Sequence, residues 1–376
     1  MTRTFVIGDP QAPFAKVLAV LDRHGALDRS ALPSGSASRS AGGALDGARL
    51  ADDVVLVSIG DHFDYDPHDP KAGDEGLRLL RWFASHDPAQ VVILLGNHDA
   101  ARVMELAALT DAGFAAARAL AGDPVRYLAV YPALPPPGVL AKDYASFSEA
   151  QRALVIELLL AGRFRLAAVG ELNDPAPRAG AGHRGPALLS HAGVTSRELA
   201  HLGLLGREDA AAIAAALDAF LAAAVARVRT DWERGVPAPL SLAPLHVTGG
   251  HGREGGGLLY HRPSNPETGS RFDPERPRRF DPRTLPSNVT QIVGHSGHAK
   301  CVQELGAWCT DAARARKHGG IRTLLVEGSR VTYDVGVGPD PLIALDNGVA
   351  ELILVDGELR RVPAAEVALL PLGALR

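Results

Sequence analysis

Three short apolar runs rich in Val, Ile and Leu lie in the first quarter of the chain, and each is followed by a glycine. They cover residues 5–7, 54–59 and 91–95. Apolar positions recur at helical spacing after each run, over residues 13–24, 75–85 and roughly 99–110. Fully apolar runs are typical of buried parallel strands. The alternation of strand and helix therefore predicts a parallel sheet with right-handed crossovers.

Beyond residue 110 the pattern becomes more helical and less regular. Helices are predicted over residues 147–161 and 207–229, and strands over residues 187–189 and 289–293. The tail alternates in the manner of β-strands over residues 322–327, 331–335, 342–345 and 351–355. Because these strands follow one another through short turns, we expect a second sheet that closes the fold.

Two stretches lack such a pattern. Residues near 29–49 are rich in Ser, Gly and Ala and predict a flexible surface insertion. Residues near 234–287 are rich in Gly, Pro, Arg and Asn, and an irregular stretch of that length is often functional. We interpret it as a substrate-access region. No repeat or domain boundary is visible, so a single domain is predicted over residues 1–376.

Composition narrows the classes of protein. With 46% hydrophobic and 22% charged residues, a soluble chain with a sizeable core is expected. The formal net charge of −4 gives no electrostatic reason to expect nucleic acid or an anionic membrane as a partner. No signal peptide pattern and no apolar run near the ~18 residues of a membrane span is apparent. Cys301 and Cys309 lack metal-pair spacing, so a cytoplasmic, reducing setting is predicted.

Polar residues come directly after the predicted strands. They are Asp9, Gln11, Asp61, Asp64, Asn97, His98, His191 and His295. Because parallel strands end at one edge of a sheet, these side chains can converge there. Carboxylate, amide and imidazole ligands without thiolate suit Mn, Fe or Zn, and a carboxylate can bridge two such ions for phosphoryl transfer. The plain alternative is a strand ending in a turn, with Asp61 as a helix cap and Asp64 as a surface charge.

In this order, the residues form five motifs that resemble those of the calcineurin-like metallophosphoesterases. The motifs are Gly8-Asp9-x-Gln11, Gly60-Asp61-x-x-Asp64, Gly96-Asn97-His98-Asp99, His191-Ala192-Gly193 and Gly294-His295-Ser296-Gly297-His298. Leu345-Asp346-Asn347-Gly348 is similar to a late strand of the family. The resemblance implies an α/β fold, with a two-sheet β-sandwich core flanked by helices and a mainly parallel first sheet. Two branches are most similar, the phosphoprotein phosphatases and the symmetrical dinucleoside tetraphosphatases.

The resemblance also implies roles for the residues. Two divalent metal ions (Mn, Fe or Zn) would be bound by Asp9, Gln11, Asp61, Asn97, His191 and His295, with Asp61 bridging them. His98, paired with Asp64, would protonate the leaving oxygen or steady the phosphate. This pair also makes independent chemical sense, because a carboxylate fixes the tautomer of an imidazole and raises its pKa.

Two positions depart from the family pattern. Gln11 stands where the family usually has His, so it is a weaker ligand, a hydrogen-bond partner of a metal-bound water, or an exposed turn residue. Tyr65 stands where the phosphoprotein phosphatases have Arg. A guanidinium for the phosphate must then come from elsewhere, and Arg102 and Arg262 are the candidates. Each could instead be an ordinary helix or loop arginine. His298 is left open between a ligand and a structural residue.

Three functions fit these residues. The first is a metal-dependent phosphoric ester hydrolase resembling the phosphoprotein phosphatases, in which hydroxide attacks a phosphomonoester at a dinuclear site. The second is a dinucleoside polyphosphate (tetraphosphate) hydrolase, which Gln11 and Asp99 favour. The third is a non-catalytic metal-binding regulatory module, suggested by Gln11 and Tyr65. The expected partner is a phosphorylated small molecule, a nucleotide or a phosphoprotein. His62, His68 and His86 are expected at the surface.

Overall fold

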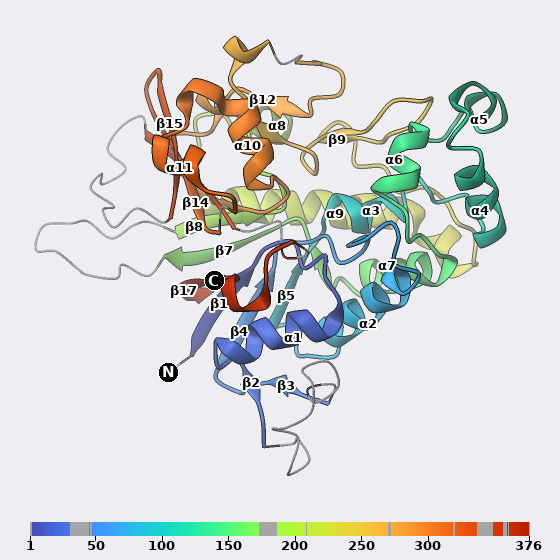
Figure 1. The fold of residues 1–376 in the computed structure, drawn as a ribbon, viewed down its shortest axis with the longest axis horizontal. Coiled ribbons are helices and arrows are strands. Elements are labelled where there is room, and N and C mark those ends of the chain that lie inside the picture. Colours follow the sequence, from blue (N-terminus) through green and yellow to red (C-terminus); the bar gives the residue numbers. More distant parts are fainter. Residues whose placement is uncertain are drawn as a thin grey trace, which may run out of the picture.

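A large mixed sheet with helices on its outer faces forms the centre of the molecule (Figure 1). The structure is a computed structural model that describes residues 2–30, 45, 47–172, 186–207, 209–269, 272–318, 320–336, 349–355, 359 and 361–375. The predicted insertion near 29–49 lies largely outside the described residues, and so do the predicted strand 342–345 and the Leu345–Gly348 motif.

The first half of the sheet is parallel, as the apolar runs predicted. Its strands are β1 (Arg3–Ile7), β4 (Val54–Ser58), β5 (Val91–Leu94) and β6 (Phe164–Arg165). They pair in this order, with Val57 opposite Val6 on one side and opposite Val92 on the other. Parallel strands covered on both faces need apolar residues throughout, which accounts for the unbroken runs.

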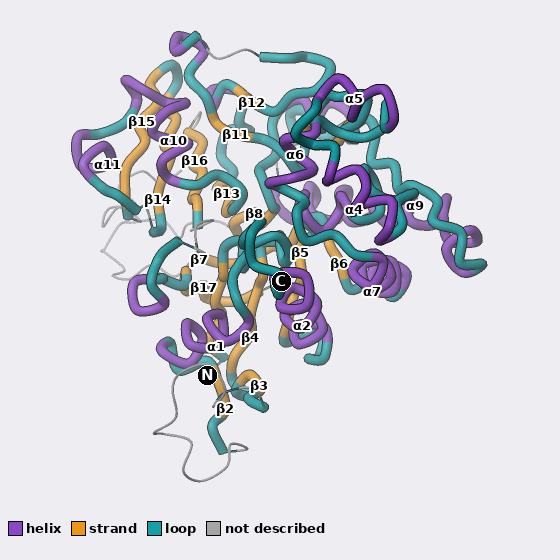
Figure 2. Tube along the Cα trace, turned by 45° about the vertical axis from the view of Figure 1, so that its right-hand side comes forward, coloured by secondary structure: helices purple, strands orange, loops and turns teal. Residues whose placement is uncertain are grey.

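The remaining strands of the large sheet are β7 (Ala167–Leu172), β8 (Pro186–Ser190), β13 (Thr290–Val293), β14 (Arg322–Glu327), β15 (Arg330–Val335), β16 (Val349–Leu354) and β17 (Leu370–Leu375). The order across the sheet is β15-β14-β16-β13-β8-β7-β17-β1-β4-β5-β6, and Figure 2 shows it running from β15 to β6. A sandwich of two separate sheets is not clearly shown, because β17 pairs antiparallel with β1 on one side and β7 on the other. That pairing joins the two halves into one ladder.

Eleven helices are described outside the 3₁₀ turns: α1 (Phe14–Arg23), α2 (Ala72–Ala84), α3 (Asn97–Ala101), α4 (Asp111–Ala119), α5 (Pro124–Val130), α6 (Pro137–Lys142), α7 (Glu149–Leu160), α8 (Ser196–Leu202), α9 (Ala210–Glu233), α10 (His298–Leu305) and α11 (Asp311–Ala315). Short strand pairs join β2 (Leu27–Asp28) to β3 (Arg49–Leu50), β9 (His246–Val247) to β10 (Gly256–Gly257), and β11 (Arg262–Pro263) to β12 (Arg279–Phe280). The 3₁₀ turns are η2 (Pro266–Thr268), η3 (Pro282–Thr284), η4 (Gly306–Trp308) and η5 (Ala364–Glu366). The described part of the region 234–287 therefore contains only such short elements.

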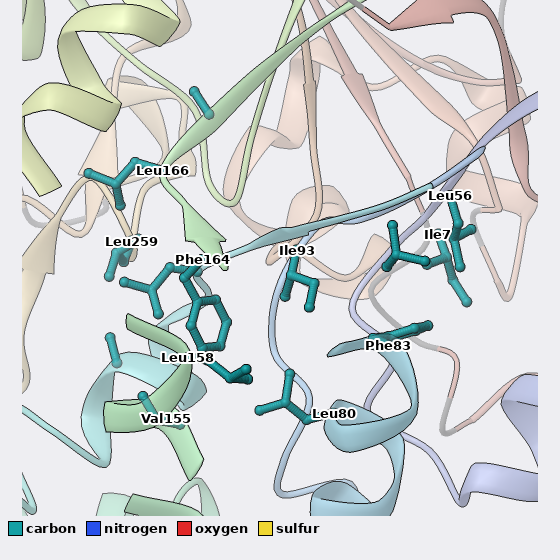
Figure 3. Packing of buried hydrophobic residues seen from close by; sticks show 14 of the residues in the cluster. Ile7, Leu56, Leu80, Phe83, Ile93, Val155, Leu158, Phe164, Leu166 and Leu259 are labelled. Atoms are coloured by element: carbon teal, nitrogen blue, oxygen red, sulfur yellow. The ribbon is translucent and has the colours of Figure 1, made fainter. Parts of the chain in front are cut away.

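Alternate residues of the strands face two different clusters. Leu56 and Ile93 lie in one cluster with Leu80 and Phe83 of α2 and with Val155 of α7 (Figure 3). Residues of α1 and α9 belong to the same cluster. Val57, on the other face of β4, joins a cluster made of residues from the sheet strands and their ends. This period of two directs one set of strand side chains toward the helices and the other set toward a cluster formed by the strands themselves.

Helix α9 is long and apolar enough, by length and composition alone, to cross a membrane. Its most apolar 18-residue window has a mean hydropathy of 1.8, so the expectation that no such stretch exists is wrong. In the structure α9 packs on β7 and β8, with Ile213 and Leu217 buried. Asp218 of the same helix accepts a hydrogen bond from Leu166 N at 2.9 Å. A core helix passes the same test, so this finding is weak evidence for a membrane.

The helix predicted over residues 99–110 is much shorter than expected. It ends at Ala101 as α3, and Arg102 N donates to Asp99 O at 3.3 Å, three residues back. In a continuing α-helix that amide would bond His98 O, but the Arg102 guanidinium takes this acceptor at 2.8 Å. A side chain thus replaces the helical hydrogen bond and the chain continues in turns.

Candidate active site

The candidate ligands stand at the ends of β1, β4, β5, β8 and β13, on one edge of the sheet. Two of these ligands, Asp61 and His295, and the His98 partner Asp64 have a left-handed backbone, with φ of 60°, 60° and 67° respectively. Non-glycine residues rarely adopt this conformation, and it clusters at functional sites.

Asp61, His191 and His295 form a compact cluster whose ligand atoms all lie within 4.8 Å of one another. His191 Nδ1 donates to Ile59 O at 2.9 Å, which leaves Nε2 as an acceptor when the imidazole is neutral. That Nε2 faces Asn97 Oδ1 at 3.0 Å and Asp61 Oδ2 at 3.5 Å. His295 Nε2 is buried and has no hydrogen-bond partner in the described part of the chain. Acceptors that converge in this way fit a cation bound between them.

Asp9 and Gln11 approach the same pocket from the end of β1. Both Asp9 oxygens accept from His295 N, at 3.0 and 2.9 Å. Burial, opposed by the charge of His191 and reinforced by that of Asp61, raises the pKa of Asp9 to about 6. Gln11 is buried, and its Nε2 donates to Phe63 O at 3.0 Å, so Oε1 is its remaining polar atom for the pocket. Gln11 is therefore not an exposed turn residue.

Glycine is required where the strand-end loops cross. A Cβ added at Gly96 would lie 2.2 Å from Asp61 Oδ1, and one added at Gly294 would lie 2.2 Å from Asp9 Oδ1. Both distances are far below any tolerated contact. The glycines that end these runs thus make room for the carboxylates, which gives the Gly-Asn-His and Gly-His motifs a steric reason.

His98 lies at the start of α3 with Nδ1 2.9 Å from Asp64 Oδ2 and Nε2 3.9 Å from Asp61 Oδ2. Burial opposes its protonation, but the Asp61 and Asp64 carboxylates outweigh burial and raise the pKa of His98 to about 9. The imidazole therefore carries a proton on the pocket side at neutral pH in the metal-free chain. Asp64 fixes its orientation, as the pairing of these residues in the sequence predicted.

Arg102 does not reach the pocket, and its predicted role as a phosphate ligand does not fit the structure. It is fully buried, and its Nη1 lies 2.6 Å from Asp64 Oδ2 while its Nε donates to Gln151 Oε1 at 3.0 Å. Asp64 also accepts from Ser146 N and Oγ, at 2.9 and 2.7 Å. Burial would raise the pKa of Asp64, but Arg102 and His98 hold it well below its usual range. Arg102 thus supports the carboxylate that orients His98.

A second buried pair connects the loops after β4 and β5. Asp99 accepts from Asp61 N at 2.9 Å, His62 N at 3.0 Å and Gly96 N at 3.0 Å. Its carboxylate also contacts His62 Nδ1 at 3.0 Å. Burial raises the pKa of Asp99, but the His62 charge and these hydrogen bonds lower it overall. His62 and His86 are both buried, so their predicted surface positions are wrong.

The pocket next to the cluster has a volume of about 290 Å³ and is lined by both acidic and basic side chains. Its lining includes Asp9, Gln11, Asp61, Asn97, His98, Asp143, Tyr260, Arg262, Arg278, His295, Lys300 and Arg361. Arg262 lines this pocket, and its role as a substrate-binding residue stays a prediction. Tyr260, Arg278, Lys300 and Arg361 were not predicted, because they lie outside any readable motif. For Arg278 the only signal was the abundance of arginine in residues 234–287.

A wider groove of about 1350 Å³ adjoins this pocket, and Asp143 and Arg361 line both. Tyr65 lines the groove and donates its hydroxyl to Asp69, so it does not stand in for a phosphate-binding arginine. His298 lies behind the pocket, buried, with Nδ1 2.8 Å from Tyr333 Oη and Nε2 3.0 Å from Ala313 O. Because both ring nitrogens of His298 have protein partners, we interpret this residue as structural and not as a metal ligand.

Comparison with known proteins agrees with the motifs. Residues 2–191 match the sequence profile of the calcineurin-like phosphoesterases. No curated protein gives a significant match. Two solved structures show weak similarity. The phosphatase domain of the Legionella effector WipB is 14% identical over 60% of this chain and 82% of its own, with a TM-score of 0.33. A cold-active protein tyrosine phosphatase is 15% identical over 80% of this chain and 68% of its own, also with a TM-score of 0.33.

Proposed function

Because the chain belongs to the calcineurin-like phosphoesterase family, we propose that it hydrolyses phosphomonoesters at a site for two divalent metal ions. Family membership makes the chain a metallophosphoesterase, and this weighs against the non-catalytic module that Gln11 and Tyr65 had left open. The observation that carries the proposal is the cluster of Asp61, His191 and His295 beside the His98–Asp64 pair. It supports acid-base chemistry next to a metal site in one pocket.

In this proposal Asp61, Asn97, His191 and His295 would hold one ion, and Asp61, Asp9 and Gln11 would hold the other. Gln11 would bind through Oε1, because its Nε2 is already occupied by Phe63 O. When bound, divalent ions stabilise charge on phosphoryl oxygens and lower the pKa of a coordinated water to near neutrality. The donor set lacks thiolate, which favours Mn, Fe or Zn.

His98 is the proposed general acid. Its Nδ1 is bonded to Asp64, so the proton on Nε2 faces the pocket and can be passed to the leaving oxygen. The Asp64 carboxylate stabilises the imidazolium before transfer, and Arg102 and Ser146 keep Asp64 in place. Arg262, in the pocket wall, would bind phosphoryl oxygens through its guanidinium.

Dinucleoside polyphosphate hydrolysis is the second candidate. Lys300 and Arg361 add two cations to a pocket that already contains Arg262 and Arg278. A phosphate chain carries more negative charge than one phosphomonoester and would use them. The cytoplasmic location of the enzyme stays a prediction from the sequence.

A substrate panel tests both candidates. The full chain is purified, loaded with Mn²⁺, and incubated with an aryl phosphate, a phosphopeptide and diadenosine tetraphosphate. Release of inorganic phosphate from the first two supports phosphomonoester hydrolysis, and nucleotide products from the third support the alternative. Asp61→Asn is the control for a contaminating phosphatase. No turnover of any substrate by metal-loaded wild-type protein would refute both candidates.

A further inference from the structure

Two arginine residues that are neighbours in the structure, Arg262 and Arg278, line the pocket. Arg262 begins β11, and Arg278 directly precedes β12. Their main chains are bonded, with Arg262 N donating to Arg278 O at 2.9 Å. The parallel pairing of β11 with β12 therefore fixes the spacing of the two residues. Neither residue belongs to an element that contributes a candidate metal ligand.

Arg278 is held in a defined position. Its Nη1 pairs with Glu254 Oε2, and its guanidinium lies 5.7 Å from the centroid of the Tyr260 ring. Its Nε is buried and has no hydrogen-bond partner among the described residues. Tyr260 is itself fixed, because its hydroxyl bonds that of Tyr144. The guanidinium is thus preorganised while part of its hydrogen-bonding capacity stays unused.

Arg262 lines the pocket beside a second cation. Burial and the neighbouring charge of Arg278 lower its pKa, and Glu254, Tyr260 and Asp143 oppose this shift only in part. Within the part of the chain that the structure describes, its guanidinium makes no hydrogen bond or ion pair. Two half-buried like charges repel, and an anion between them would offset the repulsion. Both arginines line the same pocket as Asp61 and His295, so both lie near the candidate metal cluster.

The loop after Asp64 supplies no guanidinium to this pocket. Tyr65 comes after Asp64 and faces the neighbouring groove, and Arg102 is turned away behind Asp64. Of the arginines predicted or implied for the phosphate, only Arg262 lines the pocket. A second guanidinium would let the pocket donate hydrogen bonds to a tetrahedral oxyanion from two sides.

We propose that Arg262 and Arg278 together form an oxyanion subsite, in which Arg278 supplies the second guanidinium from outside the family's motifs. Its ligand is a tetrahedral dianion such as inorganic phosphate or the phosphoryl group of a monoester. Glu254 and Tyr260 are positioning residues for Arg278. This inference rests on the proposed function for its catalytic meaning, whereas the binding of phosphate itself can be measured without turnover.

The test is titration calorimetry of inorganic phosphate into the full-length chain, with and without saturating Mn²⁺. Arg278→Gln should weaken phosphate binding roughly ten- to hundred-fold, the range for loss of charged hydrogen bonds. Arg278→Lys should recover part of the loss, because lysine retains the charge but not the planar fork. Arg253→Gln is the matched control, since Arg253 is also ion-paired to acidic residues but does not line the pocket. Its phosphate affinity should equal that of the wild type.

A folded Arg278→Gln variant with wild-type phosphate affinity would overturn the inference. If that variant does not fold, as judged by circular dichroism and melting temperature, Arg278→Lys decides: weaker binding supports the inference and unchanged binding overturns it. The double variant Arg262→Gln/Arg278→Gln should lose less affinity than the sum of the single losses predicts, because both side chains contact one ligand. Phosphate binding that depends on Arg278 without hydrolysis of any phosphoester would refute the proposed function alone.

Discussion

His98 Nε2 and Asp61 Oδ2 lie only 3.9 Å apart, yet substitution of these residues should have different consequences. Asp61→Asn should abolish metal binding and activity together, because Asp61 is central to the cluster with His191 and His295. His98→Ala should leave metal binding intact and lower kcat by roughly 10²- to 10⁴-fold, the usual contribution of a general acid. Metal content by mass spectrometry and steady-state kinetics distinguish the two. Equal metal loss in both variants would contradict the assigned roles.

Glu105 gives a prediction for the pH dependence of stability. Burial raises the pKa of this carboxyl to about 7, although it accepts a hydrogen bond from Gly249 N at 2.9 Å. The folded chain therefore binds this proton more tightly than the unfolded chain. The resulting stability is fully present below about pH 4.5 and is lost as pH rises through about 7. Glu105→Gln keeps an acceptor and removes this titration.

The measurement is urea unfolding of both proteins between pH 4.5 and 8. The free energy of unfolding of the wild type should fall relative to that of Glu105→Gln, by up to about 3 kcal/mol. Glu233→Gln alters an exposed residue at the end of α9 and serves as the control, with a constant difference from wild type. Parallel curves for wild type and Glu105→Gln would show that Glu105 does not titrate in this range.

Single residues were predictable where a motif fixed both the residue type and its place at a strand end. Asp61, Asn97 and His98 are examples, since a buried strand directs the residues after it to the sheet edge. Arg102 was not predictable in this way. Arg102 does lie close to the Asn97-His98 loop, as predicted. Its side chain, however, is oriented by contacts with Asp64 and Gln151, which are distant in sequence. Tertiary partners, which the sequence pattern does not reveal, determine where a long side chain points.

At the scale of elements, the tight turns after β4 and β5 give a steric prediction. Gly96→Ala would place a Cβ 2.2 Å from Asp61 Oδ1 and 2.3 Å from Asp61 N, so the loop carrying Asp61 must move. We expect metal affinity to fall at least about ten-fold and the free energy of unfolding to fall by about 1–3 kcal/mol. Gly138→Ala in α6 meets nothing within 4 Å and should be neutral or stabilising by up to about 1 kcal/mol. Calorimetric Mn²⁺ titration and thermal unfolding measure both effects. Unchanged metal affinity in Gly96→Ala would contradict the steric role of this turn.

Some elements could be predicted from their pattern and others could not. Strands β1, β4 and β5 are unbroken apolar runs that end in glycine-containing turns, and the sequence predicted them within a few residues. β17, with the sequence Leu-Pro-Leu-Gly-Ala-Leu, contains two poor strand formers. It is a strand because β1 and β7 offer hydrogen bonds on its two sides. Local propensity is outweighed there by pairing across the whole sheet.

For the molecule as a whole, the candidate ligands come from both halves of the sheet. Asp61 and Asn97 lie after β4 and β5, whereas His191 and His295 lie after β8 and β13. Metal binding should therefore stabilise the whole fold, because an ion that binds only the folded chain shifts the unfolding equilibrium by RT ln(1 + [L]/Kd). Mn²⁺ at about 100 times its Kd should add roughly 2.7 kcal/mol at 25 °C. Differential scanning calorimetry should show a higher melting temperature with Mn²⁺ than with EDTA, and no difference for Asp61→Asn.

Strand β17 lies between the two groups of ligands, so its packing should affect both. Leu372 is buried in the cluster between the halves of the sheet, and a Cβ added at Gly170 of β7 would lie 2.7 Å from its Cδ1. Leu372→Ala should lower the free energy of unfolding by about 2–5 kcal/mol, because it removes buried methyl groups where β1 and β7 are joined. Ala374→Ser, at an exposed position of the same strand, should stay within about 0.5 kcal/mol of wild type.

If β17 only fills the position between β1 and β7, Leu372→Ala should lower stability and leave the Mn²⁺ affinity of the folded chain unchanged. If β17 instead sets the distance between the two groups of ligands, the variant should also bind Mn²⁺ more weakly under conditions in which it remains folded. The continuous pairing of β1 with β17 and of β17 with β7 favours the second result, since no other strand among the described residues connects the halves of the ladder. Mn²⁺ titration well below the melting temperature separates the two outcomes. Wild-type affinity in a destabilised Leu372→Ala protein would limit β17 to a role in stability.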